Sequence, residues 1–137
     1  MSALVPGMKG EKSITVEARH TARHLGSGGV DVFATPSMVA LMEEAALGAV
    51  DPHLPEGQLT VGYSLDVRHL AATPMGMTVT AKAELLAVDG RMLTFRVEAF
   101  DERERIGEGT HVRVVVILGR VDERVREKAA RVVREKG

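Results

Sequence analysis

The sequence contains no cysteine, which excludes disulfide bonds, thiolate metal sites and a cysteine nucleophile. Aromatic residues make up only 3% of the chain, so its core must be built from Val, Leu, Ala and Met. The formal net charge is −1, which favours neither nucleic acid nor an anionic membrane as a partner. No apolar run approaches the roughly 18 residues of a membrane span, and the N-terminus is too polar for a signal peptide. We therefore expect a cytoplasmic protein.

The residues that are present indicate one folded unit. A chain of 137 residues suits a single domain, 1–137, and 45% hydrophobic with 27% charged residues is an ordinary globular balance. Alternating apolar and polar residues predict strands at the following positions: 12–18, 59–70, 77–88, 93–99 and 105–118. Asp89-Gly90 is a strong hairpin signal between the third and fourth of these strands. A glycine-rich loop is expected over 24–31.

Two helices are expected. Thr35-Pro36 is a favourable helix start, with a hydroxyl residue at the N-cap and proline at the first helical position. The following run, to residue 50, is apolar over most of its surface, which predicts a buried helix. A second, amphipathic helix follows the last strand, with Asp122 as its expected N-cap.

The order of these elements predicts an α+β hotdog fold. One apolar helix beside a long antiparallel sheet is expected to be wrapped by that sheet, with the second helix at the C-terminus. A sheet of this size has open edges. Two chains that pair edge to edge would close one of them, so we expect a homodimer, or a tetramer built from it.

The buried helix contains two adjacent carboxylates that are not equivalent. Glu44 points about 160° away from the centre of the apolar face, whereas Glu43 lies at the border of that face. An ionised carboxylate there needs a partner or a chemical purpose. Glu43 is therefore a candidate for acid–base or nucleophilic chemistry; the alternative is a rim position from which it reaches water.

Thr35 and His69 are the other catalytic candidates. His69 belongs to the inward face predicted for the strand 59–70, which also includes Tyr63; an inward histidine can equally be a satisfied core residue. Thr35 and Glu43 are eight residues apart, about 12 Å along a regular helix, so one straight helix cannot bring both to the same atom. Either the chain is irregular before Ser37, or the two act from different protomers.

Gly62 and Arg113 are candidate substrate-binding residues. A glycine inside a strand often marks close approach by a ligand or by another backbone, although a bulge is the alternative. Arg113 stands in an apolar strand and needs an anionic partner, such as Glu43, Glu108 or substrate. The histidines show no spacing typical of a metal site, and no cofactor is expected.

Three motifs carry a resemblance to a known family. They are VFAT-x-x-MV-x-LME at the start of the buried helix, H-x-AATP-x-G after the strand 59–70, and G-x-GTH-x-R in the last strand. Together they resemble the fluoroacetyl-coenzyme A thioesterases of the hotdog superfamily, over roughly residues 13–120. The resemblance implies catalytic roles for Thr35, Glu43 and His69, and places Gly62 and Arg113 near the thioester.

The resemblance also implies a function. We expect hydrolysis of a short-chain acyl-coenzyme A to the free acid and coenzyme A, with Glu43 as nucleophile or as general base. The family's aromatic lid segment, which favours fluorine, corresponds here to 24–31, a stretch without aromatic residues. A general short-acyl preference follows. The alternatives are an enoyl-coenzyme A hydratase, for which the aspartate–histidine pair is missing, and a non-catalytic acyl-coenzyme A binding module.

Overall fold

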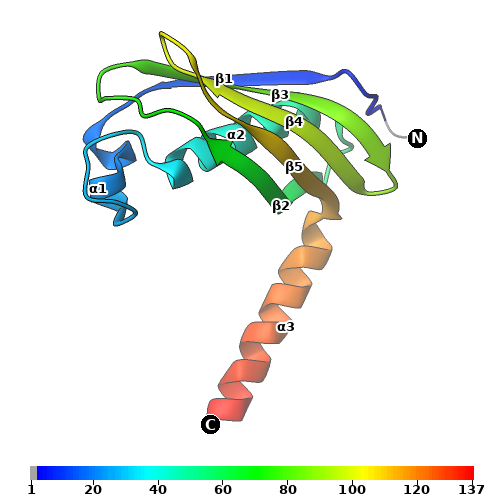
Figure 1. Ribbon diagram of the computed structural model, residues 1–137. Helices are drawn as coiled ribbons and strands as arrows, with labels where there is room; N and C mark the ends of the chain where they lie inside the picture. Colours follow the sequence, from blue (N-terminus) through cyan, green and yellow to red (C-terminus); the bar gives the residue numbers. More distant parts are fainter. Residues whose placement is uncertain (1–2) are drawn as a thin grey trace.

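A curled antiparallel sheet encloses one helix, and a second helix projects away from this body (Figure 1). The computed structural model describes residues 3–137. The strands are β1 (Lys9–Thr15), β2 (Gln58–His69), β3 (Thr78–Asp89), β4 (Met92–Phe100) and β5 (Arg105–Ile117). The helices are α1 (Ala22–Leu25), α2 (Thr35–Val50) and α3 (Leu118–Lys136), with 3₁₀ turns η1 (Ala18–His20) and η2 (Asp51–His53).

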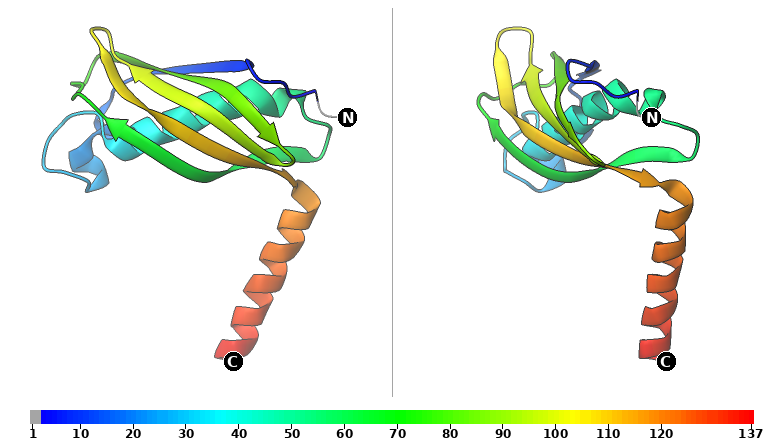
Figure 2. Two further views of the ribbon diagram at one scale, coloured as in Figure 1. Left: turned by 45° about the vertical axis from the view of Figure 1, so that its right-hand side comes forward. Right: turned by 90° about the vertical axis from the view of Figure 1, so that its right-hand side faces the viewer.

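The sheet has the order β1-β3-β4-β5-β2, so β1 and β2 are its edges. All pairings are antiparallel. Turned end-on, the strands bend around α2, as the hotdog prediction requires (Figure 2). Most of the side chains that the alternation predicts inward on β3 and β4 are buried: Val79, Ala81, Ala83, Leu85, Leu93, Phe95, Val97 and Ala99. Ala87, which is also predicted inward, is exposed, because the pairing of β3 with β4 shifts register between Leu85 and Ala87. The period of two in this part of the sequence therefore identified the core correctly.

Close packing fixes α2 against the sheet. Its buried side chains are Met38, Leu41, Met42, Ala45, Ala46, Ala49 and Val50. Gly10 of β1 crosses α2 at Ala45, and a Cβ atom at Gly10 would collide with the Ala45 carbonyl. Small residues on both sides thus allow the two backbones to approach each other. The prediction of a buried helix is confirmed, and α2 becomes a rigid support for the side chains on its remaining face.

The face prediction for β2 is partly wrong. The pairing with β5 shifts register between Gly62 and Ser64, so Tyr63 is an extra residue in a bulge. Side chains before the bulge consequently exchange faces: Val61 is 41% and Tyr63 68% exposed, although both were expected inside, while Thr60 is buried. His69, after the bulge, keeps its predicted direction toward α2.

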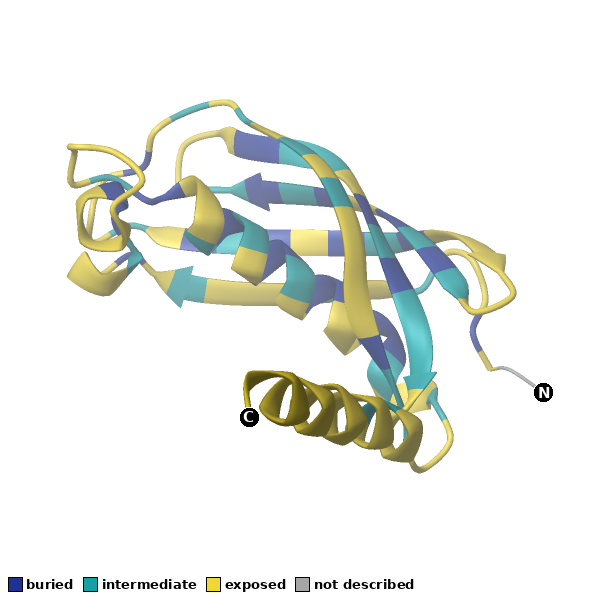
Figure 3. Ribbon diagram, turned by 90° about the horizontal axis from the view of Figure 1, so that it is seen from below, coloured by how far each residue is buried: buried dark blue, intermediate teal, exposed yellow. Residues whose placement is uncertain are grey.

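Both terminal elements begin earlier than predicted. β1 runs over Lys9–Thr15 rather than 12–18: its pairing with β3 already starts at Lys9. It also ends earlier, because the chain turns into η1, where the His20 ring accepts a hydrogen bond from the Glu17 amide at 2.9 Å. α3 continues directly from β5, and its N-cap is Ile117 rather than Asp122. No residue of α3 is buried (Figure 3). Within residues 3–137, no helix is both long and apolar enough to cross a membrane.

Candidate active site

Thr35 does not cap α2 as expected. Ala34 occupies the N-cap, and Thr35 is the first residue of the helix. Its hydroxyl lies instead 2.7 Å from Nδ1 of His69, at the end of β2. The structure therefore brings Thr35 and His69 together, and it replaces the predicted structural role of the hydroxyl by a contact with the histidine.

His69 is held in a partly enclosed position. Burial lowers the pKa of His69 below its ordinary value, because the charged form is the more costly one to desolvate. The ring is therefore neutral at neutral pH and can exchange a hydrogen bond with Thr35. Its Nε2 atom is buried and makes no well-aligned hydrogen bond within residues 3–137, while an interaction of the ring with the Ala71 backbone partly opposes the lowering of the pKa.

A hollow adjoins this pair. Its volume is about 350 Å³, and its lining comes from the start of α2, from the segment before α2 and from the residues at the end of β2 and just after it. The lining residues are Ala22, Ser27, Val32, Phe33, Ala34, Thr35, His69, Leu70, Ala71 and Ala72. Most of these side chains are small or apolar. The hollow can therefore take a small apolar group beside one hydroxyl and one imidazole.

Glu43 lies farther along α2, in a different environment. Its side chain is 38% exposed, and its Oε2 atom is 3.6 Å from Nη1 of Arg113. A Cβ atom on Gly62 would lie 2.5 Å from the same oxygen, so only glycine at this position leaves room for the carboxylate. Glu44 is exposed. The helical wheel therefore distinguished the two carboxylates correctly, and Glu43 has the rim position that was the alternative to full burial. Gly62 directly precedes the bulge at Tyr63, and the group that approaches it closely is the Glu43 side chain rather than another backbone.

Arg113 is buried, and protein atoms hold its guanidinium. Its Nε donates to Thr60 Oγ1 at 2.8 Å and its Nη2 to the Thr60 carbonyl at 3.0 Å, while Nη1 lies 3.1 Å from Nε2 of His111. Thr60 in turn donates from its hydroxyl to Asp51 Oδ1 at 2.5 Å. Burial lowers the pKa of Arg113, and the nearby Asp51 and Glu43 oppose this effect. Glu43 is thus one of the anionic partners expected for Arg113.

Three members of this network escaped the sequence analysis: Asp51, Thr60 and His111. The sequence feature that could have indicated further partners was the arginine in an apolar strand, because a guanidinium has five N–H donors and one carboxylate cannot accept them all. The partners come from α2's C-terminal end, β2 and β5, and the pairing of β2 with β5 brings them together. His111 stands in the G-x-GTH-x-R motif of the last strand, but no local pattern in the sequence marks Asp51 or Thr60.

One chain does not bring all the catalytic candidates together. Thr35 and Glu43 are eight residues apart on α2, about 12 Å along a regular helix. The helix is continuous from Thr35, so the irregular start considered above is not found. The chain thus presents two separate groups along the face of α2 that borders β2: Thr35 with His69, and Glu43 with Gly62 and Arg113.

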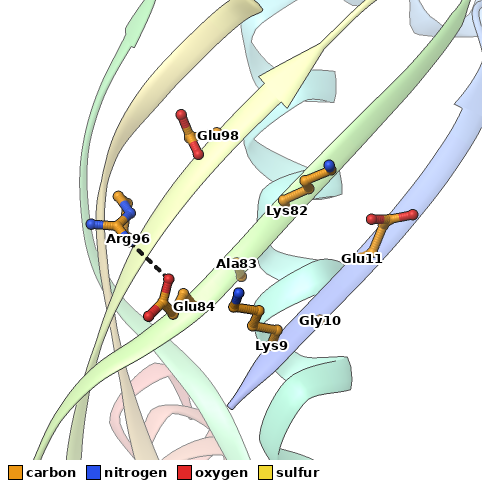
Figure 4. A pocket seen from close by; sticks show the side chains of 8 residues that line it. All are labelled: Lys9, Gly10, Glu11, Lys82, Ala83, Glu84, Arg96 and Glu98. Carbon is orange, nitrogen blue, oxygen red and sulfur yellow. Dashed lines mark hydrogen bonds and ion pairs between the residues drawn. The ribbon is translucent and has the colours of Figure 1, made fainter. Parts of the chain in front are cut away.

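The outer face of the sheet carries a hollow of a different kind. Its volume is about 330 Å³, and acidic and basic side chains alternate around it on β1, β3 and β4 (Figure 4). Arg96 donates to Glu84 there at 2.8 Å. These groups are exposed or half-exposed and compensate one another, as on an ordinary solvated surface. The hollow is separated from α2 by the sheet, so it plays no part in the site.

Replacing Gly62 by alanine tests the close approach to Glu43. The added methyl group is expected to displace the carboxylate by about 1 Å, and a shift of this size can lower kcat by about 100-fold. Global stability should change little, because the displaced atom is the end of a flexible side chain. Thiol release and thermal unfolding would measure the two effects.

Gly48→Ala is the matched control, because its Cβ would meet no atom within 4 Å. It should leave kcat unchanged and stabilise α2 by up to about 1 kcal/mol. A Gly62→Ala enzyme with wild-type kcat would show that the position of the Glu43 carboxylate does not limit the reaction.

A sheet curled around a central helix is the hotdog fold, and comparisons with known proteins place the chain among the thioesterases that have this fold. The chain belongs to the fluoroacetyl-CoA-specific thioesterase family, whose model matches residues 16–118. It is 48% identical over 98 residues to the fluoroacetyl-CoA thioesterase of Streptantibioticus cattleyicolor, covering 72% of this chain and 70% of that protein. The protein is therefore a thioester hydrolase that converts an acyl-CoA to the free acid and CoA.

Solved structures agree with this assignment. A variant of the fluoroacetyl-CoA-specific thioesterase in complex with fluoroacetate and CoA is 40% identical, with a TM-score of 0.81, over 86% of this chain and 99% of that one. A thioesterase superfamily member from Thermus thermophilus is 30% identical, with a TM-score of 0.88, over 96% and 97% of the two chains. The hotdog fold expected from the order of the elements is confirmed.

Proposed function

We propose that this thioesterase acts on short-chain acyl-CoA without a preference for fluorinated groups. The hollow beside Thr35 and His69 is bordered mostly by small or apolar side chains and is large enough for a short acyl group. Ser27, in the segment 24–31, contributes to its lining, and that segment contains no aromatic residue that could cover the acyl group. The preference for fluoroacetyl-CoA that names the relatives is therefore not expected here.

Glu43 supplies the reacting carboxylate in this proposal. The observation that carries it is the environment of Glu43: a partly exposed carboxylate at the border of the buried face of α2, beside a buried guanidinium and a glycine. At 3.6 Å, Arg113 is too far for a good hydrogen bond but close enough to stabilise the ionised carboxylate. The lone pairs of Glu43 consequently stay available for attack or for proton abstraction.

The reaction needs water and no cofactor. Either Glu43 attacks the thioester carbonyl carbon, giving an anhydride that water then opens, or Glu43 takes a proton from water as the water attacks. The C–S bond breaks in both routes, and the thiolate of CoA leaves and takes up a proton. Thr35, oriented by His69, and the amide of Gly62 bind the carbonyl oxygen as negative charge develops on it.

We propose that each site is shared between two chains. Gly62 and His69 are seven residues apart on β2, about 23 Å along an extended strand. β2 is an edge strand, so a second β2 can pair with it antiparallel about a two-fold axis. Because Tyr63 is an extra residue in the bulge, an axis at Asp66 would place His69 of the second chain directly opposite Gly62. Directly opposed residues project to the same face, and both residues here face α2.

This arrangement makes the functional unit a homodimer. It covers the β2 edge and joins the Glu43 group of one chain to the Thr35–His69 group of the other. Val61 and Tyr63, exposed beside that edge, would then contact the second chain. We further propose a cytoplasmic location, because a chain without cysteine gains nothing from an oxidising compartment.

A panel of thioesters tests the substrate proposal. Acetyl-, propionyl-, butyryl- and fluoroacetyl-CoA are compared by kcat/KM, and released thiol is measured directly because the protein has no cysteine. We expect turnover of the unfluorinated short chains, with fluoroacetyl-CoA within about tenfold of acetyl-CoA, because one small substituent in an apolar pocket changes binding by only about 1–3 kcal/mol. A large preference for fluoroacetyl-CoA, or hydration of crotonyl-CoA in place of hydrolysis, would contradict the proposal.

A further inference from the structure

His111 is fully buried beside the reacting carboxylate's partner, yet the mechanism above does not use it. It stands on β5 two residues before Arg113 and projects to the same face of the strand. Its ring packs 6.2 Å from that of Phe95, between centroids, inside the core. A histidine in such a place must have both ring nitrogens satisfied or lose stability.

The two hydrogen bonds of His111 determine its tautomer. Nδ1 lies 2.8 Å from the carbonyl oxygen of Ser64, which can only accept, so Nδ1 carries the proton. Nε2 lies 3.1 Å from Nη1 of Arg113, which can only donate, so Nε2 presents its lone pair. Burial also lowers the pKa of His111, in keeping with an uncharged ring. The bulge at Tyr63 precedes Ser64, where the β2 ladder is interrupted.

The guanidinium of Arg113 is consequently held from two sides. Thr60 receives hydrogen bonds from Nε and Nη2, and His111 receives one from Nη1. Nη1 has two hydrogens, and the atom near its remaining one is Glu43 Oε2, at 3.6 Å. With one hydrogen of Nη1 engaged by His111, the other is left free to face the carboxylate, at a distance that is too long for a good hydrogen bond but suits an ion pair. The orientation of the guanidinium relative to Glu43 thus depends on the hydrogen-bond acceptor Nε2 of His111.

We propose that His111 is a positioning residue of the hydrolytic site: in its neutral form, protonated on Nδ1, it orients Arg113 so that the guanidinium stays beside Glu43. Its effect passes through Arg113 and requires no contact with the substrate. This inference rests on the proposed role of Glu43 as the reacting carboxylate.

Two amide substitutions separate this role from simple packing. In His111→Gln, the amide oxygen can occupy the place of Nε2 and still accept from Arg113. In His111→Asn, the shorter amide can replace only Nδ1 and cannot reach Arg113. We expect His111→Gln to keep kcat within about threefold of wild type, and His111→Asn to lose at least about tenfold in kcat with KM nearly unchanged, because each 1.36 kcal/mol lost in the transition state lowers the rate tenfold.

A second pair of variants tests the hydrogen bonds that Thr60 accepts from the Arg113 guanidinium. Thr60→Ser keeps the hydroxyl between Asp51 and Arg113, whereas Thr60→Val removes it at nearly constant volume. The serine variant should retain kcat and the valine variant should lose it. This pair decides the question if a His111 variant does not fold. Equal kcat within both pairs would overturn the proposal.

The Glu43→Gln background separates the proposed positioning role of His111 from the proposed catalytic role of Glu43. If His111 acts through Arg113 on Glu43, His111→Asn should lower kcat no further once Glu43 is neutral, because residues acting as one unit are not additive. A full additional tenfold loss in that background contradicts the positioning role. Wild-type turnover by Glu43→Gln alone would instead contradict the proposed catalytic carboxylate.

Discussion

Replacing Glu43 by glutamine is expected to lower kcat for acyl-CoA hydrolysis by about 10²- to 10⁴-fold, the usual contribution of a general base. The substitution keeps the size of the side chain and removes its charge. Its amide can neither attack the carbonyl carbon effectively nor accept a proton from water. Binding should suffer little, because the CoA portion of the substrate is far larger than the reacting group. The measurement is thiol release at saturating acetyl-CoA.

The adjacent carboxylate provides the control. Glu44→Gln makes the same chemical change on the same helix turn, but Glu44 is exposed and the structure assigns it no partner in the site. It should leave kcat within about twofold, as substitutions at such surface positions usually do. Comparable losses in both variants would show that charge on α2 in general matters, and not the carboxylate opposite Arg113. Unchanged turnover by Glu43→Gln would remove Glu43 from the mechanism.

Mixing two inactive variants is expected to restore activity. In a dimer of one Glu43→Gln chain and one His69→Ala chain, a shared site contains either both intact residues or both substituted ones. Random association makes half of the dimers mixed, and half of the sites in those are intact. The purified mixed dimer should therefore show about one half of the wild-type activity per dimer, and an unfractionated random mixture about one quarter. The chains are mixed by co-expression with two different affinity tags, and the mixed dimer is purified before assay.

The same experiment has a clear contrary outcome. If Glu43 and His69 of one chain served the same site, every site in the mixed dimer would carry one substitution and remain inactive. Purified mixed dimers without activity would therefore contradict the shared site. Mixtures of two differently tagged Glu43→Gln chains are the matched control and should remain inactive. A chain that elutes as a monomer would contradict the dimer itself.

The regular parts of the fold followed from local patterns. The alternation in 77–88 and 93–99 predicted the inner faces of β3 and β4 up to Leu85, and the apolar run after Thr35 predicted the buried α2. These predictions held because each element buries one continuous apolar face, and burial of that face is the dominant driving force for folding. The helical wheel alone also separated Glu43 from Glu44.

The errors occurred where one local interaction replaced another. The bulge at Tyr63 reversed the predicted faces at the start of β2, because one extra residue shifts every side chain before it. Thr35 was expected to cap α2, but its hydroxyl contacts His69, which is 34 positions away in the sequence. Both outcomes depend on the strand that lies alongside, which a single stretch of sequence does not reveal.

By itself, then, the sequence determined which elements form, which faces most of them bury, and that Glu43 lies at the border of the buried face of α2 whereas Glu44 points away from it. Only the tertiary structure decided the environment of that carboxylate: Arg113 beside it, with Thr60 and His111 holding the guanidinium, and Thr35 with His69 about 12 Å away along the helix. The physical reason is the difference in sequence separation between the contacts involved. Periodicity records contacts within one turn or one strand, whereas a buried charge is stabilised by whichever polar groups the pairing of distant strands brings within about 4 Å of it.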